Sequence, residues 1–144
     1  MQMNLLLRPI IDEGFDFIQG SRFLPGGYYG NMPFYRLLAT KYIHPLIFSF
    51  FMGKKITDST NGFRAINMSV FEDRKINLEQ DWLNKYELEP YLFAKVIKLG
   101  YKVKEVAVSK IYPSPKLGYT KMSPIIDWWS ILKPVLLVGL GIRK

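Results

Sequence analysis

Hydrophobic and polar positions recur with two different periods along the chain, and together they predict an α/β fold. Residues 4–13 and 88–99 space their apolar side chains as amphipathic helices do, and a glycine follows each of them. Residues 15–18 and 101–108 alternate between apolar and polar side chains, which is typical of strands. The order of helix, glycine and strand at the start of the chain suits an α/β unit.

Residues 33–52 predict a long helix whose surface is unusually apolar. Pro45 is expected to kink or divide this helix, because proline lacks a backbone N–H. One polar stripe runs along it with a residue at every fourth position: Arg36, Thr40 and His44. We interpret His44 as a stripe residue beside the kink rather than as a catalytic base.

Residues 125–142 predict a C-terminal helix that is apolar and aromatic, with a narrow polar stripe formed by Asp127, Ser130 and Lys133. Either this amphipathic helix packs on the domain core, or its tryptophans and lysine place it at a membrane interface, which we favour. The chain is therefore divided into residues 1–122, the α/β portion, and residues 123–144, the apolar helix.

Composition limits the chemistry. The 144 residues are 49% hydrophobic, so they can bury a core, and they contain no cysteine and one histidine. Disulfides, thiolate metal sites and two-histidine relays are thereby excluded. The net charge of +8 indicates an anionic partner, either a lipid head group or a phosphorylated substrate. Nucleic acid is not expected, because neither an arginine-rich arm nor an RNA-binding aromatic signature is present.

The segment 56–64 gathers a carboxylate, hydroxyls, an amide, a glycine and a guanidinium within a few positions. Taken alone, it reads as a polar turn. Residues 23–32, which hold three glycines, read either as a mobile flap over a ligand or as a surface loop.

Three further segments could converge with residues 56–64 on one site. They are the strand end at 20–22, the helix start at 86–90 and a basic-aromatic loop at 110–122. Carboxylates at Asp58 and at Glu87 or Glu89 could serve as base and orienting acid, while arginines and lysines hold phosphate. The competing interpretation is that the glutamates favour a helix N-terminus and that the lysines are solvated.

Four motifs carry a resemblance to a known family. They are Gly-Phe-Asp-Phe-Ile-x-Gly-Ser-Arg at 14–22, Asp-Ser-Thr-Asn-Gly-Phe-Arg at 58–64, Glu-Leu-Glu-Pro at 87–90 and Leu-Gly-Tyr-Lys-Val-Lys-Glu-Val-Ala-Val at 99–108. The chain resembles the C-terminal half of a family 2 glycosyltransferase of the dolichol-phosphate or polyprenyl-phosphate sugar synthase type. The resemblance implies part of a GT-A fold, a mixed sheet flanked by helices.

The resemblance also implies partners and residue roles. A complete enzyme of this type transfers a sugar from a nucleotide sugar to a lipid phosphate or a glycan, uses Mg²⁺ or Mn²⁺, and lies on the cytoplasmic face of the membrane. Asp58 would be the acceptor-side base, and Glu89 would lie on the same side of the cleft. Substrate or phosphate would be held by Arg22, Ser21, Asn61, Arg64, Lys110 and Lys121.

The chain departs from the family pattern in two places. Ala107 replaces the usual proline of the Glu-Val-Pro strand, and the Asp-x-Asp metal motif with its donor-binding segment does not precede Leu5. We therefore expect these residues alone to bind no metal and to be inactive, and to pair with the missing half or with a second copy. The alternative is a non-catalytic membrane-surface or partner-binding module derived from a glycosyltransferase.

Overall fold

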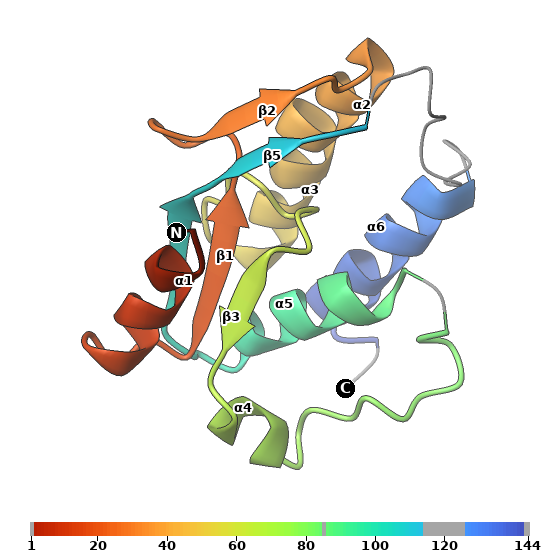
Figure 1. Ribbon diagram of the computed structural model, residues 1–144. Helices are drawn as coiled ribbons and strands as arrows, with labels where there is room; N and C mark the ends of the chain where they lie inside the picture. Colours follow the sequence, from red (N-terminus) through yellow and green to blue (C-terminus); the bar gives the residue numbers. More distant parts are fainter. Residues whose placement is uncertain (1, 85, 114–125, 143–144) are drawn as a thin grey trace.

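The computed structural model describes residues 2–84, 86–113 and 126–142. It is an α/β structure built on a three-stranded mixed sheet with the order β3-β1-β4 (Figure 1). The central strand β1 (Phe17–Ser21) runs antiparallel to β3 (Arg64–Ile66) and parallel to β4 (Val103–Ala107). Helix α1 (Gln2–Ile11) covers one face of this sheet, and α3 (His44–Met52) and α5 (Leu88–Lys98) lie on the other side (Figure 1).

Strand β1 differs from its prediction. It begins two residues later than expected and continues through Gly20 and Ser21, and it is buried along its whole length because strands flank it on both sides and helices cover both faces of the sheet. A Cβ atom at position 20 would lie 2.6 Å from the carbonyl oxygen of Phe63. Glycine is therefore needed inside this strand, where the backbone of the next segment approaches closely.

A second sheet lies where the sequence predicted only loops. Strand β2 (Tyr28–Gly30) pairs in parallel with β5 (Ser109–Ile111). The interpretation of residues 23–32 as a free flap is thus wrong for three of its residues, which hydrogen-bond to β5. This pairing holds β5 beside the end of β1 (Figure 1).

The predicted helix 33–52 is present but is divided into three parts. They are α2 (Phe34–Leu38), a π-helical segment η1 (Ala39–Ile43) and α3, which has Pro45 in its first turn. The change of helix type falls just before the proline, where a missing N–H disturbs the regular hydrogen bonds. The expected division near Pro45 is therefore confirmed.

The remaining helices are short or packed on the core. A single turn, α4 (Ser69–Glu72), follows β3, and α6 (Ile126–Gly139) packs against α5 and α3. Asp127 and Ser130 of the predicted polar stripe are buried in this packing, while Trp129 is exposed. Within the described ranges, no helix is both long and apolar enough to cross a membrane.

The core lies between the sheet and the helices α3 and α5. Phe93 stacks on Phe17 of β1 at 4.9 Å between ring centroids and on Phe48 of α3 at 4.7 Å. All three rings are completely buried. One aromatic side chain therefore connects the sheet to both helices.

Replacement of Phe93 by alanine should lower the free energy of unfolding by about 3–5 kcal/mol, because it removes two ring contacts and leaves a cavity. The matched control is Phe50→Ala on α3, since Phe50 is 81% exposed and its loss should cost less than about 0.5 kcal/mol. Urea denaturation followed by circular dichroism measures both. Equal losses would contradict this location of the core.

Candidate functional site

The site is organised by a buried ion pair between Arg22 and Asp58. Arg22 directly follows β1, at the end where the parallel strands β1 and β4 both finish. Its Nε and Nη2 donate to the two carboxylate oxygens of Asp58 at 2.7 Å each, and its backbone N–H donates to the same carboxylate at 3.1 Å. Both side chains are almost fully buried. Burial alone would lower the pKa of Arg22, but the contacts with Asp58 raise it above its usual value.

Glu105 of β4 holds the backbone on which Asp58 sits. Its carboxylate accepts the backbone N–H groups of Thr57 and Asp58 and the hydroxyl of Thr57, all at 2.9–3.0 Å. Burial raises the pKa of Glu105, although these donors favour the ionised form. The sequence motif pointed to this strand but did not identify the glutamate as part of the site.

Ser21 and Asn61 hydrogen-bond within the protein. The hydroxyl of Ser21 lies 2.6 Å from that of Thr57. The amide of Asn61 donates to the carbonyl of Gly20 at 2.9 Å, and the Asn61 backbone carbonyl accepts from Gln19. The hydrogen bonds of both residues thus connect the end of β1 to the segment 56–64, and neither residue contributes to the cavity wall.

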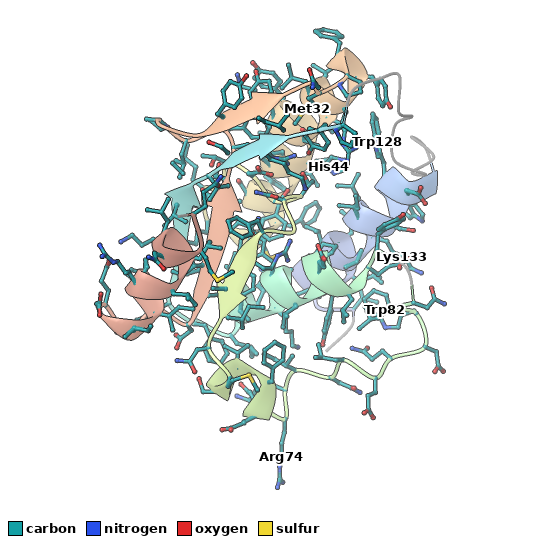
Figure 2. All side chains as sticks on the ribbon, in the orientation of Figure 1. Met32, His44, Arg74, Trp82, Trp128 and Lys133 are labelled. Atoms are coloured by element: carbon teal, nitrogen blue, oxygen red, sulfur yellow. The ribbon has the colours of Figure 1, made fainter. Side chains whose placement is uncertain are left out.

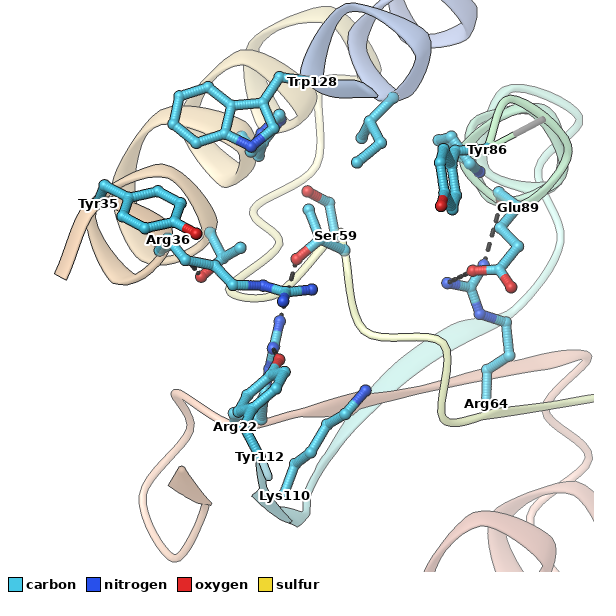
Figure 3. A pocket seen from close by; sticks show the side chains of 15 residues that line it. Arg22, Tyr35, Arg36, Ser59, Arg64, Tyr86, Glu89, Lys110, Tyr112 and Trp128 are labelled. Carbon is cyan, nitrogen blue, oxygen red and sulfur yellow. Dashed lines mark hydrogen bonds and ion pairs between the residues drawn. The ribbon is translucent and has the colours of Figure 1, made fainter. Parts of the chain in front are cut away.

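A cavity of about 250 Å³ opens beside the ion pair (Figure 3). Its walls come from the end of β1, from α2, η1 and α3, from residues 59–64, from residues 110–112, and from the starts of α5 and α6. Among the described residues, the cationic side chains that line it are Arg22, Arg36, Arg64 and Lys110. Glu89 is the carboxylate in the same lining, so the cavity carries an excess of positive charge.

Tyr112 brings three of these cations together. Its hydroxyl accepts a hydrogen bond from Nη1 of Arg22. Its ring lies 4.8 Å from the Arg36 guanidinium and 5.4 Å from the Lys110 ammonium. Partial burial, followed by the charges of Arg22 and Arg36, lowers the pKa of Lys110. A bound anion would relieve the repulsion among these groups.

Arg64 and Glu89 form a second pair at another side of the cavity (Figure 3). Nη2 of Arg64 lies 3.3 Å from Oε2 of Glu89, and Nη1 donates to the Glu89 backbone carbonyl at 3.1 Å. Burial lowers the pKa of Arg64 despite the nearby carboxylate. The Glu89 side chain is 60% exposed, so this carboxylate is accessible while that of Asp58 is not.

The polar stripe of the long helix faces the cavity. Arg36, Thr40 and His44 all line it, beside Trp128 of α6. His44 is 2% exposed, its Nδ1 has no hydrogen-bond partner among the described residues, and its ring meets that of Trp128 edge-on at 5.9 Å. Burial lowers the pKa of His44 to about 4.

Several predicted site residues thus meet in space. Arg22, Arg64, Glu89 and Lys110 line the cavity, whereas Asp58 lies behind Arg22 with both carboxylate oxygens engaged. Lys121 lies outside the described residues. Sequence reasoning missed Arg36 as a site residue, although it identified the helical stripe that carries it.

The residues that the structure describes do not offer a ligand set for a divalent cation. Within residues 2–84, 86–113 and 126–142, no group of three histidine, aspartate or glutamate side chains is close enough to bind a metal ion. The carboxylates of Asp58 and Glu89 are paired with arginines. The expected use of Mg²⁺ or Mn²⁺ by a complete enzyme stays a prediction.

Comparison with known proteins supports the resemblance inferred from the motifs. The chain is 34% identical over 113 residues to a polyprenol monophosphomannose synthase of Mycolicibacterium smegmatis, covering 78% of this chain and 41% of that protein. It is 26% identical over 141 residues to a dolichyl-phosphate hexose transferase of Haloferax volcanii, covering 93% of this chain and 54% of that protein.

An uncharacterized protein of Methanocaldococcus jannaschii is 28% identical over 110 residues, which cover 74% of this chain and 42% of that protein. The chain therefore spans about half the length of the curated relatives it matches. No family model matches the chain, and no solved structure matches it significantly.

Replacement of Asp58 by alanine should destabilise the fold by about 3–5 kcal/mol, because it leaves the Arg22 charge buried without its partner. Glu13→Ala is the control: Glu13 pairs with Lys104 at 2.6 Å, but both side chains are exposed, and their pair should contribute less than about 1 kcal/mol. Urea denaturation at pH 7 measures both variants. A small loss for Asp58→Ala would show that the fold does not depend on this pair.

His44 should make stability fall as the pH is lowered. Its pKa is about 4 when folded and 6.5 in the unfolded chain, so the unfolded state takes up the proton first. Between pH 7 and pH 5, wild type should lose about 2 kcal/mol more than His44→Asn, which does not titrate. Urea denaturation of both proteins at the two pH values measures this difference. Parallel losses would contradict a buried neutral His44.

Proposed function

We propose that this chain forms the acceptor-side portion of a family 2 glycosyltransferase with a GT-A fold, which transfers a sugar from a nucleotide sugar to a polyprenyl phosphate. The observation that carries the proposal is the cavity in which Arg22, Arg36 and Lys110 gather around Tyr112. Such a group of guanidinium and ammonium donors suits a phosphate, and the relatives' names include polyprenol and dolichyl phosphate.

The proposed reaction does not require a protein side chain to act as a base. A phosphate monoester oxygen of the lipid is already anionic near neutral pH and attacks the anomeric carbon of the sugar. The bond from this carbon to the diphosphate oxygen of the donor then breaks, and the nucleoside diphosphate leaves with the electron pair. No proton has to be removed from the acceptor.

In this proposal the cationic residues hold and orient the lipid phosphate. Arg22 and Arg36 would contact its oxygens, and Lys110 would add charge at the mouth of the cavity. Asp58 would orient Arg22 instead of acting as a base, because both of its carboxylate oxygens already accept hydrogen bonds from Arg22. Glu89, the accessible carboxylate, would lie beside the sugar-acceptor junction and hold Arg64 in place.

A location at the membrane surface fits the same proposal. Exposed apolar side chains recur at every fourth position along α2, η1 and α3: Phe34, Leu38, Tyr42, Leu46 and Phe50. An apolar stripe of this kind is suited to the boundary between lipid head groups and acyl chains. The same stripe favours the second candidate function, a non-catalytic membrane-surface module derived from a glycosyltransferase.

Binding of an alkyl phosphate tests the proposal. Purified protein should bind decyl monophosphate more tightly than decanol, and Arg36→Ala should weaken the binding of decyl monophosphate about tenfold or more, since hydrogen bonds to charged groups contribute about 1.5–3 kcal/mol. Arg74→Ala is the matched control, because Arg74 is exposed and points away from the cavity (Figure 2). Isothermal titration calorimetry measures each affinity.

The outcomes separate the two candidate functions. The acceptor site is supported if the protein binds decyl monophosphate more tightly than decanol, and if Arg36→Ala weakens the binding of decyl monophosphate while Arg74→Ala does not. Equal affinity for decanol and decyl monophosphate would reject the acceptor site. It would favour the membrane-surface module, because such a module binds the apolar chain of the ligand and does not require the phosphate.

A further inference from the structure

We propose that Glu105 is a positioning residue of the anion site: it fixes the backbone at Thr57 and Asp58 and thereby sets the direction of the Arg22 guanidinium. This inference rests on the proposed function only in that Arg22 contacts the ligand's phosphate. Glu105 itself does not line the cavity, so its effect must pass through the residues between them.

The first link joins β4 to the segment that carries Asp58. One oxygen of the Glu105 carboxylate accepts from both backbone N–H groups and from the Thr57 hydroxyl, at 3.0 Å each. The other oxygen shares the Thr57 N–H at 2.9 Å. Three donors that converge on one carboxylate leave the Thr57–Asp58 peptide little freedom to rotate.

The second link joins the same segment to β1. Because the proton of the Thr57 hydroxyl is directed at Glu105, the hydroxyl of Ser21 must donate across the 2.6 Å contact between them. Ser21 in turn accepts the backbone N–H of Phe23 at 3.2 Å. The residues on both sides of Arg22 are therefore tied to the network that Glu105 holds.

The third link is the ion pair. Asp58 fixes Nε and Nη2 of Arg22, which leaves Nη1 directed at Tyr112 beside the cavity. A guanidinium is planar, so two bonds on one edge determine where the remaining nitrogen points. A shift of the Asp58 backbone would turn this plane away from the cavity.

Burying the Glu105 carboxylate costs free energy, and we take this cost as a sign that the shape and charge of the carboxylate are needed at this position. Burial raises the pKa of Glu105 and disfavours its ionised form, and the hydrogen bonds from Thr57 and Asp58 offset only part of this cost. Glutamine has nearly the same size but presents an N–H group in place of one acceptor oxygen. Glu105→Gln should therefore make the Thr57–Asp58 segment less rigid without removing any side chain that lines the cavity.

Exchange of the Arg22 Nε–H with solvent, followed by NMR, tests this positioning without any ligand. We expect exchange at least tenfold faster in Glu105→Gln, with the backbone amide of Phe93 in the core unchanged. The matched control is Glu13→Gln, which removes a carboxylate that pairs with Lys104 of the same strand and should change neither rate. An unchanged exchange rate of the Arg22 Nε–H in Glu105→Gln would overturn the proposal. Equal acceleration at Arg22 and at the Phe93 amide would also overturn it, because the whole fold would then be loosened and the role of Glu105 would be purely structural.

Binding of decyl monophosphate provides the second readout. Its affinity should fall about tenfold in Glu105→Gln and stay within twofold in Glu13→Gln. If wild type binds the phosphate and Glu105→Gln binds it equally well, the positioning role is rejected. If wild type itself does not prefer decyl monophosphate to decanol, the proposed function fails, and the exchange experiment still decides whether Glu105 orients Arg22.

Discussion

The pair of Arg22 and Asp58 is the constraint on which the rest of the site depends. Two charges that are almost fully buried are tolerated only when each satisfies the other with good geometry, and here two 2.7 Å bonds do so. The pair joins residue 22, at the end of the central strand, to residue 58, in the segment that precedes the antiparallel strand. It therefore determines where a guanidinium meets the cavity as well as how two distant segments pack.

The cavity keeps its charge because its neighbours are arranged around this pair. Arg36 and Lys110 both lie against the ring of Tyr112, whose hydroxyl accepts from Arg22. An aromatic ring can lie between cations without neutralising them, because it attracts each of them through its face. The result is a concave surface whose described lining holds more cationic side chains than carboxylates, whereas a carboxylate at the position of Tyr112 would have reduced this excess. This difference separates an anion-binding site from a purely structural ion-pair network.

Sequence reasoning located most elements but not all of their contacts. The helices at 88–99 and 125–142, the strand at 101–108 and the division near Pro45 were predicted, because periodicity, glycine and proline act locally. Strands β2 and β5 were missed, since each has only three residues and each depends on pairing with the other. Motifs brought Arg22, Asp58 and Arg64 to one site, yet only the folded chain shows that Arg22 occupies both oxygens of Asp58. Glu105 was hidden because its role lies in accepting backbone N–H groups, which leave no trace in the sequence.

The long helix shows how a change in helix type can serve the site. In a regular α-helix, positions four residues apart are rotated by about 40° relative to each other, so a stripe such as Arg36, Thr40 and His44 would drift around the helix. A π-helical turn holds more residues and rotates the same spacing in the opposite sense. Because η1 covers Ala39–Ile43, it offsets the drift and keeps all three side chains on the cavity wall. The same offset reduces the drift of the exposed apolar positions Phe34, Leu38, Tyr42, Leu46 and Phe50 along the solvent side of this helix.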